Sequence, residues 1–395
     1  MNAFGFAWRS LVRQPARATL GVLGVAAVGA LLLDMLLLSQ GLILSMRDLF
    51  DRAGFDLRVT ATDALPGQGP RMPDGMATAQ AISTLPAVRS AVALRAADAV
   101  LENGGRRLRA SFQGFGGAGV RPWTIVRGRD IQGGRDLLVN ENVARRLDLA
   151  PGTRLRVRAS CVEGPESLPP IEFTVAGVAT FPFDTPYGAT SATSMEALDQ
   201  ACGGNEQGQA DLIMVASADG STSANTAAAI SRLKPDVRVL TNDELVGRFS
   251  SGGFSYFRQI STVLTTVTVA FAVLLITVLL TVSVNQRLGE IAALRALGFT
   301  RFRVVADVLC ESVLIVGGGG LLSLPLGAAL AVGLDAILKR IPGIPTDVHF
   351  FVFRPGALGV HAALLAVTAL VAALYPVQVV ARLPIAATLR NEVVG

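Results

Sequence analysis

The chain has 395 residues, of which 51% are hydrophobic and only 16% are charged, a composition typical of membrane proteins. Its net charge of +5 does not come from the long polar segment between Arg47 and Arg258, where 23 Lys and Arg balance 23 Asp and Glu. The excess lies in and beside the hydrophobic segments, as expected when basic residues set membrane orientation. Composition and charge therefore argue against a nucleic-acid partner.

Four stretches are apolar enough to cross a bilayer, which needs about 20 helical residues. They cover residues 19–44, 259–284, 304–336 and 356–379. The first follows Arg9, Arg13 and Arg17 and stays apolar well beyond the hydrophobic region of a secretory signal, which favours an uncleaved signal-anchor over a cleaved signal peptide.

The arginines predict the orientation of these spans. Basic residues gather in 1–18, 285–303 and 380–395, so these segments are expected in the cytoplasm. The polar segment 45–258 and the loop 337–355 then lie outside. The predicted fold class is a membrane protein with four transmembrane α-helices, one N-terminal and three C-terminal, and a large α+β domain between the first and second.

The outside domain shows strand and helix patterns along its length. Strands are predicted at 55–62, 108–115, 154–159 and 171–180. A short helix capped by Asn140 runs to Leu149, ahead of a turn at Pro151-Gly152. Thr241-Asn242 marks the start of another helix, which we expect to continue toward the second span, so that helical stalks flank the domain.

The residues needed for common catalytic sites are missing from the sequence. An ATP-binding P-loop ends in Gly-Lys-Ser/Thr, and neither Lys234 nor Lys339, the two lysines of the chain, has that context. The two histidines, His349 and His361, are too few and too scattered for a zinc site or a histidine-dependent triad. We expect no catalytic residue and no metal site on this chain.

Ionisable residues inside spans are the usual indication of function in a membrane. Asp34 lies in the first span, and Asp307 and Glu311 share one face near the inner end of the third. Each also has a structural interpretation: Asp34 at the outer interface or a subunit contact, and Asp307 with Glu311 paired to nearby arginines.

Two further features leave alternatives open. Cys161 and Cys202 of the outside domain are either a disulfide or two unpaired thiols. The third span contains four consecutive glycines, 317–320, followed by Pro325 and Gly327. These residues suit close helix packing or, alternatively, a flexing span.

A short charged helix is predicted between the second and third spans, ending at Gly298. One side of it carries Gly and Ala, and the other mixes leucines with charges. Such a helix suits docking into a groove of another protein; the alternative is packing on its own bundle.

The segment Arg287-Leu-Gly-Glu-Ile-Ala-Ala-Leu-Arg-Ala-Leu-Gly298, followed by Glu311 and the glycine-rich 317–327, resembles the FtsX-like permease domain of the MacB/LolC/FtsX superfamily of type VII ABC transporters. The tail 381–392 resembles the ending of that family. Residues 138–147 with Pro151-Gly152 are similar to the periplasmic core domain of MacB-like permeases.

This resemblance implies an inner-membrane permease whose outside domain is periplasmic. It implies a dimer with a second copy or sister subunit, and a separate cytoplasmic ABC ATPase that carries ATP and Mg, none of which this chain binds. The ATPase would dock on residues 285–303, with the coupling helix formed by Arg287, Glu290, Ile291, Leu294, Arg295 and Gly298.

The resemblance leaves three functions open. A MacB-like exporter would work with a periplasmic membrane-fusion adaptor, whereas a LolC-like machine would extract lipid-anchored cargo from membrane lipid. An FtsX-like transducer would instead control a periplasmic partner such as a cell-wall hydrolase. A membrane-anchored enzyme or sensor is the remaining class, and it predicts activity in the 47–258 domain alone.

Overall fold

The computed structural model describes residues 5, 9, 11–13, 15–65, 67, 69–117, 119–161, 168–204, 207–251, 255–286, 288, 289, 300–341, 351, 352 and 355–381. The chain divides into two compact units, a helical bundle and a mixed α+β domain formed mainly by residues 43–255. Each is described by itself.

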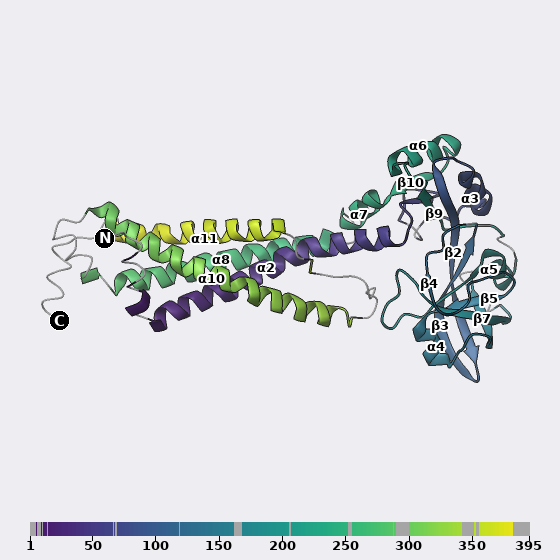
Figure 1. The fold of residues 1–395 in the computed structure, drawn as a ribbon, viewed down its shortest axis with the longest axis horizontal. Coiled ribbons are helices and arrows are strands. Elements are labelled where there is room, and N and C mark those ends of the chain that lie inside the picture. The colour runs from purple at the N-terminus through teal and green to yellow at the C-terminus, as the bar shows by residue number, and fades with distance from the viewer. Residues whose placement is uncertain are drawn as a thin grey trace. The chain divides into compact units, whose positions relative to one another are not determined.

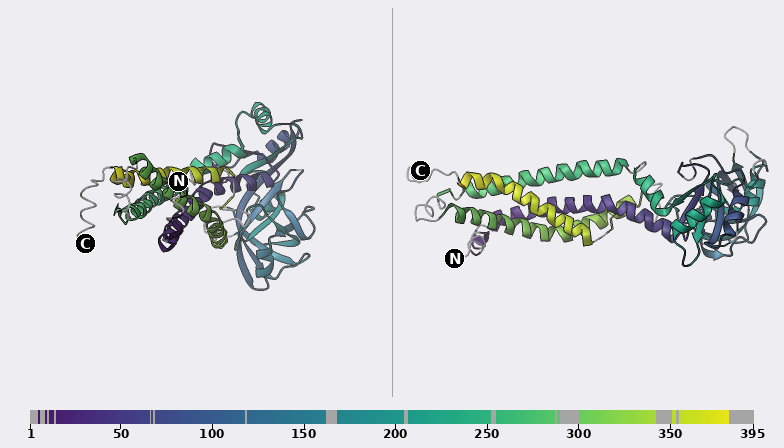
Figure 2. Two further views of the ribbon diagram at one scale, coloured as in Figure 1. Left: turned by 60° about the vertical axis from the view of Figure 1, so that its left-hand side comes forward. Right: turned by 90° about the horizontal axis from the view of Figure 1, so that it is seen from above.

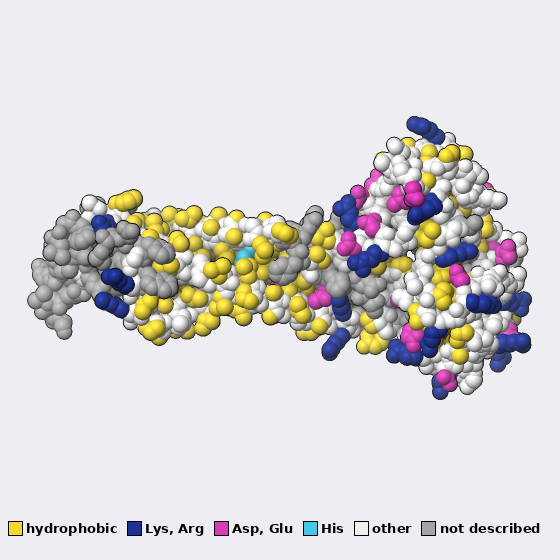
Figure 3. All heavy atoms as spheres, viewed as in Figure 1, with side chains coloured by type: hydrophobic (Ala, Val, Ile, Leu, Met, Phe, Trp, Pro, Cys, Tyr) yellow, Lys and Arg dark blue, Asp and Glu magenta, His cyan; other side chains and the backbone are white. Residues whose placement is uncertain are grey.

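The bundle consists of four long helices that lie side by side (Figures 1 and 2). They are α2 (Pro15–Arg52), α8 (Ser255–Asn285), α10 (Arg301–Leu338) and α11 (Pro355–Ala381). Four segments of these helices are long and apolar enough to cross a membrane: Ala18–Leu38, Gln259–Val282, Leu309–Leu338 and Pro355–Gln378. Hydrophobic side chains cover much of the bundle surface in Figure 3, as expected for helices solvated by lipid. The predicted fold class is confirmed.

Contacts between the helices fix their relative directions. Helices α2 and α10 run the same way, whereas α8 and α11 run the opposite way. The defining neighbours are Gly21–Leu279, Gly24–Leu275 and Ser261–Met35 for α2 with α8, Gly319–Val25 and Gly327–Leu33 for α2 with α10, and Gly320–Leu365 and Ser323–His361 for α10 with α11. This is the alternation that a four-span topology requires.

The mixed domain is built on a ten-stranded sheet. Its strands are β1 (Leu57–Thr60), β2 (Val88–Asn103), β3 (Arg106–Gly116), β4 (Thr124–Gly128), β5 (Asp136–Val139), β6 (Arg154–Ser160), β7 (Ile171–Thr180), β8 (Thr190–Ser194), β9 (Leu212–Ser217) and β10 (Arg238–Thr241). Its helices are α3 (Gly75–Ser83), α4 (Glu141–Leu147), α5 (Met195–Ala201), α6 (Ser223–Leu233) and α7 (Asn242–Ser251).

The long strand β2 joins two parts of this sheet. Its first half pairs with β9, which continues to β1 and β10 in an antiparallel sheet that carries α3 and α6. Its second half pairs with β6, and β6 also pairs with β7. The pairings of β2, β3, β8, β5, β7 and β6 therefore run in a closed circuit, so these six strands leave few unpaired edges.

Each part of the sheet has its own hydrophobic core. The largest core lies within the strand circuit and under α4 and α5, and includes Phe112, Phe173 and Leu198. A second core lies between α3, α6 and the β9–β1–β10 strands, around Ile82, Ile213 and Ile230. Burial of side chains of this kind contributes about 1.5–3 kcal/mol each to folding. A third cluster includes Val92, Phe115 and Phe181, so the domain has the hydrophobic interior expected of a folded unit of this size.

Most of the predicted elements are present, with adjusted ends. The strand expected at 55–62 is shorter, and those expected at 108–115, 154–159 and 171–180 correspond to β3, β6 and β7. Asn140 caps α4 as predicted, because its side chain accepts a hydrogen bond from the Val143 amide at 3.0 Å. The helix beginning at Thr241-Asn242 is α7; it ends at Ser251, and residues 252–254, where it would have continued toward the second span, lie outside the described residues.

Cys161 and Cys202 form a disulfide, with their Cα atoms 5.5 Å apart. The bridge ties the end of β6 to the C-terminal cap of α5, and both cysteines belong to the largest core. The structure thus selects pairing from the two alternatives that the sequence left open.

We expect reduction of this disulfide to lower the free energy of unfolding of the mixed domain by about 4 kcal/mol, from the entropy of closing a loop across a separation of 41 residues. Thermal unfolding of the full chain with and without dithiothreitol measures the effect. A Cys310→Ala variant should respond like the parent protein, and a Cys161→Ala/Cys202→Ala variant should be insensitive to the reductant. Equal unfolding temperatures of the parent protein in both conditions would contradict the prediction.

Candidate functional site

The predicted coupling helix lies almost entirely outside the described residues, including Arg287, Glu290, Ile291, Leu294, Arg295 and Gly298. Between Arg287 and Gly298 the structure describes only Leu288 and Gly289, which are helical; Leu288 is half-buried and Gly289 is buried. The role of the segment therefore stays a prediction.

Asp34 is fully buried in the bundle, at 0% exposure. Neither of its carboxylate oxygens has a hydrogen-bond partner among the described residues. It is flanked on α2 by Leu33 and Leu37, which pack against Ala331 of α10 and Ala357 of α11. The carboxylate is thus held among this chain's own helices and not at an interface with water, which is costly for a charged group and typical of a functional one.

Asp307 and Glu311 both belong to α10. Glu311 is buried at 7% exposure, whereas the side chain of Asp307 lies outside the description. The four-residue spacing predicted that the two share one face of a helix. This requires a continuous helix through both positions, and α10 provides it.

A second buried polar group in the bundle was not predicted. Ser323 Oγ and His361 Nε2 lie 3.0 Å apart, joining α10 to α11, and both residues are buried. Gly29 of α2 lies against them, since a Cβ at this position would meet Ser323 Cβ at 2.8 Å and His361 Cε1 at 3.8 Å. Three helices therefore meet at one polar contact. His361 was expected inside the fourth span, but nothing in the sequence indicated Ser323 as its partner.

In the mixed domain, polar contacts join the C-terminal end of α2 to the start of α7. Arg47 pairs with Asp243, and Asn242 Nδ2 donates to Asp51 Oδ1 at 2.8 Å and to the Phe55 carbonyl at 3.1 Å. We refer to the contacts of Arg47, Asp51, Asn242 and Asp243 as the α2–α7 clasp. Apolar packing of Phe50 with Leu240, Leu245 and Val246 accompanies it. The clasp joins the two helices through which the chain enters and leaves the domain.

The start of α7 has the hydrogen bonds of a capping box. Thr241 N donates to Glu244 Oε2 at 3.0 Å, and Glu244 N donates to Thr241 Oγ1 at 3.2 Å. This arrangement fixes the first turn of the helix, and with it the position of Asn242 in the clasp. The Thr241-x-x-Glu244 pattern is the sequence signal for it.

Arg58 of β1 lies beside the clasp and is only 4% exposed. Its Nη1 donates to the carbonyls of Phe55 at 3.0 Å and Leu57 at 3.1 Å, with a longer contact of 3.5 Å to Asn242 Oδ1. The guanidinium also lies 5.7 Å from the centroid of the Phe50 ring. Burial lowers the pKa of Arg58 to about 10, against the opposing effect of Asp56 and Asp51, so the side chain remains charged at neutral pH.

The neighbouring carboxylate is held by other partners. Asp56 accepts hydrogen bonds from Ser217 N at 2.8 Å and from Ser217 Oγ at 2.5 Å. Burial by itself raises the pKa of Asp56, but the hydrogen bonds from Ser217 and Ser223 outweigh it and hold the pKa below its ordinary value. Asp56 is therefore ionised and satisfied without Arg58.

An apolar cavity of about 350 Å³ lies between α2, α7 and the sheet. It is lined by Met46, Phe50, Ala53, Arg58, Leu94, Gln113, Phe115, Pro122, Phe181, Pro182, Phe183, Thr190, Leu212, Met214 and Leu245. Arg58 is the single charged residue of this lining. A mostly apolar cavity of this size with a few polar residues, here Arg58, Gln113 and Thr190, is typical of a small-ligand site.

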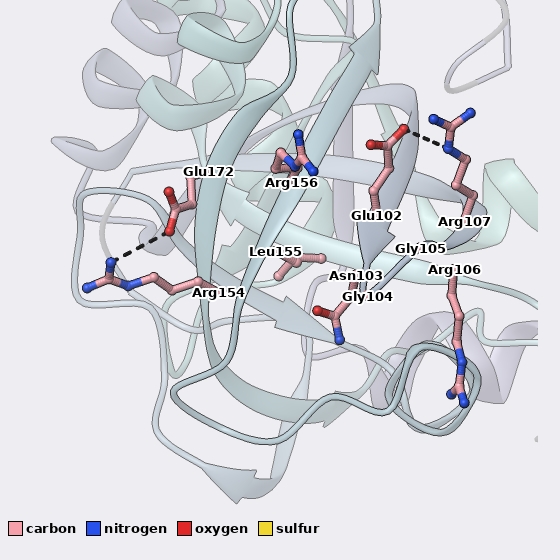
Figure 4. Close-up of a pocket in the computed structure, with 10 residues that line it drawn as sticks. All are labelled: Glu102, Asn103, Gly104, Gly105, Arg106, Arg107, Arg154, Leu155, Arg156 and Glu172. Carbon is pink, nitrogen blue, oxygen red and sulfur yellow. Dashed lines mark ion pairs between the residues drawn. The ribbon is translucent and has the colours of Figure 1, made fainter.

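A separate, polar hollow lies at the β2–β3 hairpin (Figure 4). Arginines from two strands, β3 and β6, surround it, namely Arg106, Arg107, Arg154 and Arg156. Glu102 pairs with Arg107 at 3.1 Å and Glu172 with Arg154 at 3.7 Å, and these arginines are largely exposed. Exposed pairs of this kind contribute little to stability. Because its lining has four arginines and two glutamates, the hollow is a basic surface.

The described residues contain no group of three His, Cys, Asp or Glu side chains that could hold a metal ion. The strongest features of the described structure are thus the buried polar residues of the bundle, the clasp and the cavity beside it. None of them has the arrangement of a nucleophile, base and oxyanion donors that an active site needs.

Comparisons with known proteins identify two family regions. The model of the MacB-like periplasmic core domain matches residues 18–233, and the model of the FtsX-like permease C-terminal domain matches residues 262–385. A search of curated proteins gives no match.

Among solved structures, the chain is similar to the periplasmic region of MacB from Actinobacillus actinomycetemcomitans, with 13% identity and a TM-score of 0.38 over 48% of this chain and 91% of that one. It is also similar to the extracellular domain of the noncanonic ABC-type transporter YknZ from Gram-positive bacteria, with 14% identity and a TM-score of 0.34 over 47% of this chain and 99% of that one. The two family models together cover most of the chain, in the order of its two units. The chain therefore belongs to the FtsX/MacB-like family of permeases, with a MacB-like periplasmic core domain followed by an FtsX-like C-terminal permease domain.

Proposed function

We propose that this permease couples ATP hydrolysis on a separate cytoplasmic ABC ATPase to a conformational change of its periplasmic domain. That change would drive export or extraction of a hydrophobic, lipid-linked or peptide-like substrate across or out of the inner membrane. The proposal is carried by the presence of both family domains on one chain. Neither of the two lysines of this chain fits a P-loop. The energy source must then be a second protein.

The α2–α7 clasp supports a mechanical form of this coupling. Helix α2 is continuous from Pro15 to Arg52, so it contains the first span and also supplies Arg47 and Asp51 to the clasp. A displacement of α2 is passed to α7 through the ion pair and the Asn242 hydrogen bonds. In this proposal the clasp keeps the two helices moving together when the ATPase changes state.

The partners follow from the same proposal. A second permease copy or sister subunit would complete the dimer in the membrane. The apolar groove between α10 and α11, lined by Val313, Leu321 and Ala366 among others, offers a surface for that subunit or for lipid. The basic hollow at the β2–β3 hairpin suits an acidic surface of a periplasmic adaptor.

Charge reversal in the coupling segment tests the proposal. We expect Glu290→Arg and Arg295→Glu each to reduce co-purification of an ABC ATPase with the full-length permease at least tenfold, because each reversal places like charges at the docking surface. The measurement is affinity purification from native membranes in mild detergent, with quantification of bound ATPase and its ATP turnover.

Arg13→Glu is the matched control, since Arg13 is an exposed arginine before the first span. It should retain the ATPase. If both coupling variants also retain it at the parent level, or if no ABC ATPase accompanies the parent protein, the proposed function is wrong.

A further inference from the structure

The guanidinium of Arg58 has donors that the protein does not use. All hydrogen bonds that Arg58 makes within the described residues come from Nη1. Nε and Nη2 therefore have no acceptor there, although the residue is only 4% exposed to solvent. Neither atom is among the fully buried polar atoms that lack a partner, so both retain accessible surface beside the cavity that Arg58 lines, where an anion inside the cavity can accept from them.

The cavity beside Arg58 has the opposite character. Most of its lining is aromatic or aliphatic, including Phe115 of β3, Leu212 and Met214 of β9, and Phe181 and Phe183. Its volume of about 350 Å³ is comparable to that of one medium-length acyl chain. Transfer of such a chain from water into an apolar cavity is favourable, and the gain grows with each CH₂ group that is buried.

The nearby carboxylates accept their hydrogen bonds from residues other than Arg58. Asp51 accepts from Asn242, and Asp56 accepts from Ser217. Neither aspartate lines the cavity, so a ligand inside it meets a single charge, which is positive.

From these observations we propose that the cavity binds a single-chain anionic amphiphile, with its acidic headgroup at Arg58 and its acyl chain against the phenylalanines. The site deepens the proposed function, on which its biological meaning rests, by naming the chemical class of a substrate or regulator. The occupant touches Phe50 of α2 and Leu245 of α7, the helices that the clasp holds. Its binding therefore bears directly on the helices that carry the coupling movement.

Trp123 provides a reporter within the native chain. Its ring lies 4.8 Å from Phe115 and 6.1 Å from Phe181, centroid to centroid, and both phenylalanines line the cavity. The sequence has two tryptophans, so a Trp8→Phe variant leaves Trp123 as the sole indole. A terminally brominated dodecanoate bound in the cavity would place its heavy atom near this ring and quench its fluorescence.

The experiment uses full-length Trp8→Phe protein in nanodiscs, titrated with brominated dodecanoate, dodecanol or dodecyltrimethylammonium below their critical micelle concentrations. We expect saturable quenching by the anion, with an apparent affinity at least tenfold above that of the alcohol and of the cation. Arg58→Gln should remove this preference for the anion. Ala53→Phe, which fills the cavity and leaves Arg58 in place, should abolish quenching by all three, whereas Arg145→Gln, at an exposed arginine, should change nothing.

Non-saturable quenching that Ala53→Phe leaves unchanged would show that the probes act from the lipid, and would overturn the proposal. Equal affinity for anion and alcohol in the parent protein would also overturn it, because Arg58 would then select nothing. No ATPase is present in this experiment. Failure here thus leaves the ATPase co-purification result standing, and failure of that result leaves this binding site intact.

Discussion

Replacing Gly319 by alanine is expected to destabilise the helical bundle, whereas the same replacement at Gly317 leaves it unchanged or more stable. A Cβ at Gly319 would lie 2.6 Å from Val25 Cβ and 2.9 Å from the Val22 carbonyl oxygen of α2. The second of these atoms belongs to the backbone and cannot rotate away, so α2 and α10 must separate. Overpacking of this kind costs about 1–3 kcal/mol.

Gly317 provides the matched control. It belongs to the same glycine run on α10, and a Cβ there meets no atom within 4 Å. Both replacements gain the same helix propensity, about 0.5–1 kcal/mol in favour of alanine, so their difference isolates helix packing. Midpoints of unfolding in mixed micelles with increasing SDS, followed by helical circular dichroism, measure it. Equal midpoints for the two variants would show that the glycines serve flexing and not close approach.

Removal of the Arg95 side chain is expected to cause a large loss of stability in the mixed domain. Arg95 of β2 and Asp199 of α5 form an ion pair at 2.9 Å, with side chains exposed by only 1% and 9%. Asp199 also accepts from the Gly208 amide at 3.0 Å. Arg95→Ala leaves a buried carboxylate without its countercharge, which costs about 3–5 kcal/mol. In a domain of this size that corresponds to a fall of roughly 6–20 °C in Tm.

Two further variants separate charge burial from a general effect of losing an arginine. Arg107→Ala removes an ion pair to Glu102 in which Arg107 is 72% exposed, and should cost under about 1 kcal/mol. Arg95→Met combined with Asp199→Leu removes both buried charges and should recover most of the lost stability. Trp123 fluorescence follows unfolding of the domain. A small effect of Arg95→Ala, similar to that of Arg107→Ala, would contradict the prediction.

The bundle was accessible from sequence because its physical requirement is local. In lipid a helix must form all of its backbone hydrogen bonds within itself. About 20 apolar residues bounded by arginines therefore predict a span wherever they occur. Helix capping is equally local, and Asn140 and Thr241-x-x-Glu244 were recognisable for that reason. Strand β2 was not predicted from the sequence. Residues 88–103 pair first with β9 and then with β6, so their side chains do not show the simple alternation of apolar and polar residues that marks a half-buried strand.

The candidate sites divide in the same way. Asp34 and His361 were visible as polar residues inside spans, but the pairing of His361 with Ser323 brings together residues 38 positions apart on different helices. Arg58 gave no signal, since an arginine in a strand is usually exposed, and its contact with Asn242 joins residues 184 positions apart.

The sequence by itself determined the class of the protein: four segments apolar enough to cross a membrane, one large domain between the first and second, two lysines that fit no P-loop, and the motifs of the FtsX-like and MacB-like domains. Each of these depends on composition, periodicity or a short run of neighbouring residues. Only the tertiary structure decided that Cys161 pairs with Cys202, that α2 and α7 are clasped, and that Arg58 lines an apolar cavity. These features join residues distant in the chain, and their free energy depends on burial that exists only after the sheet and helices have packed.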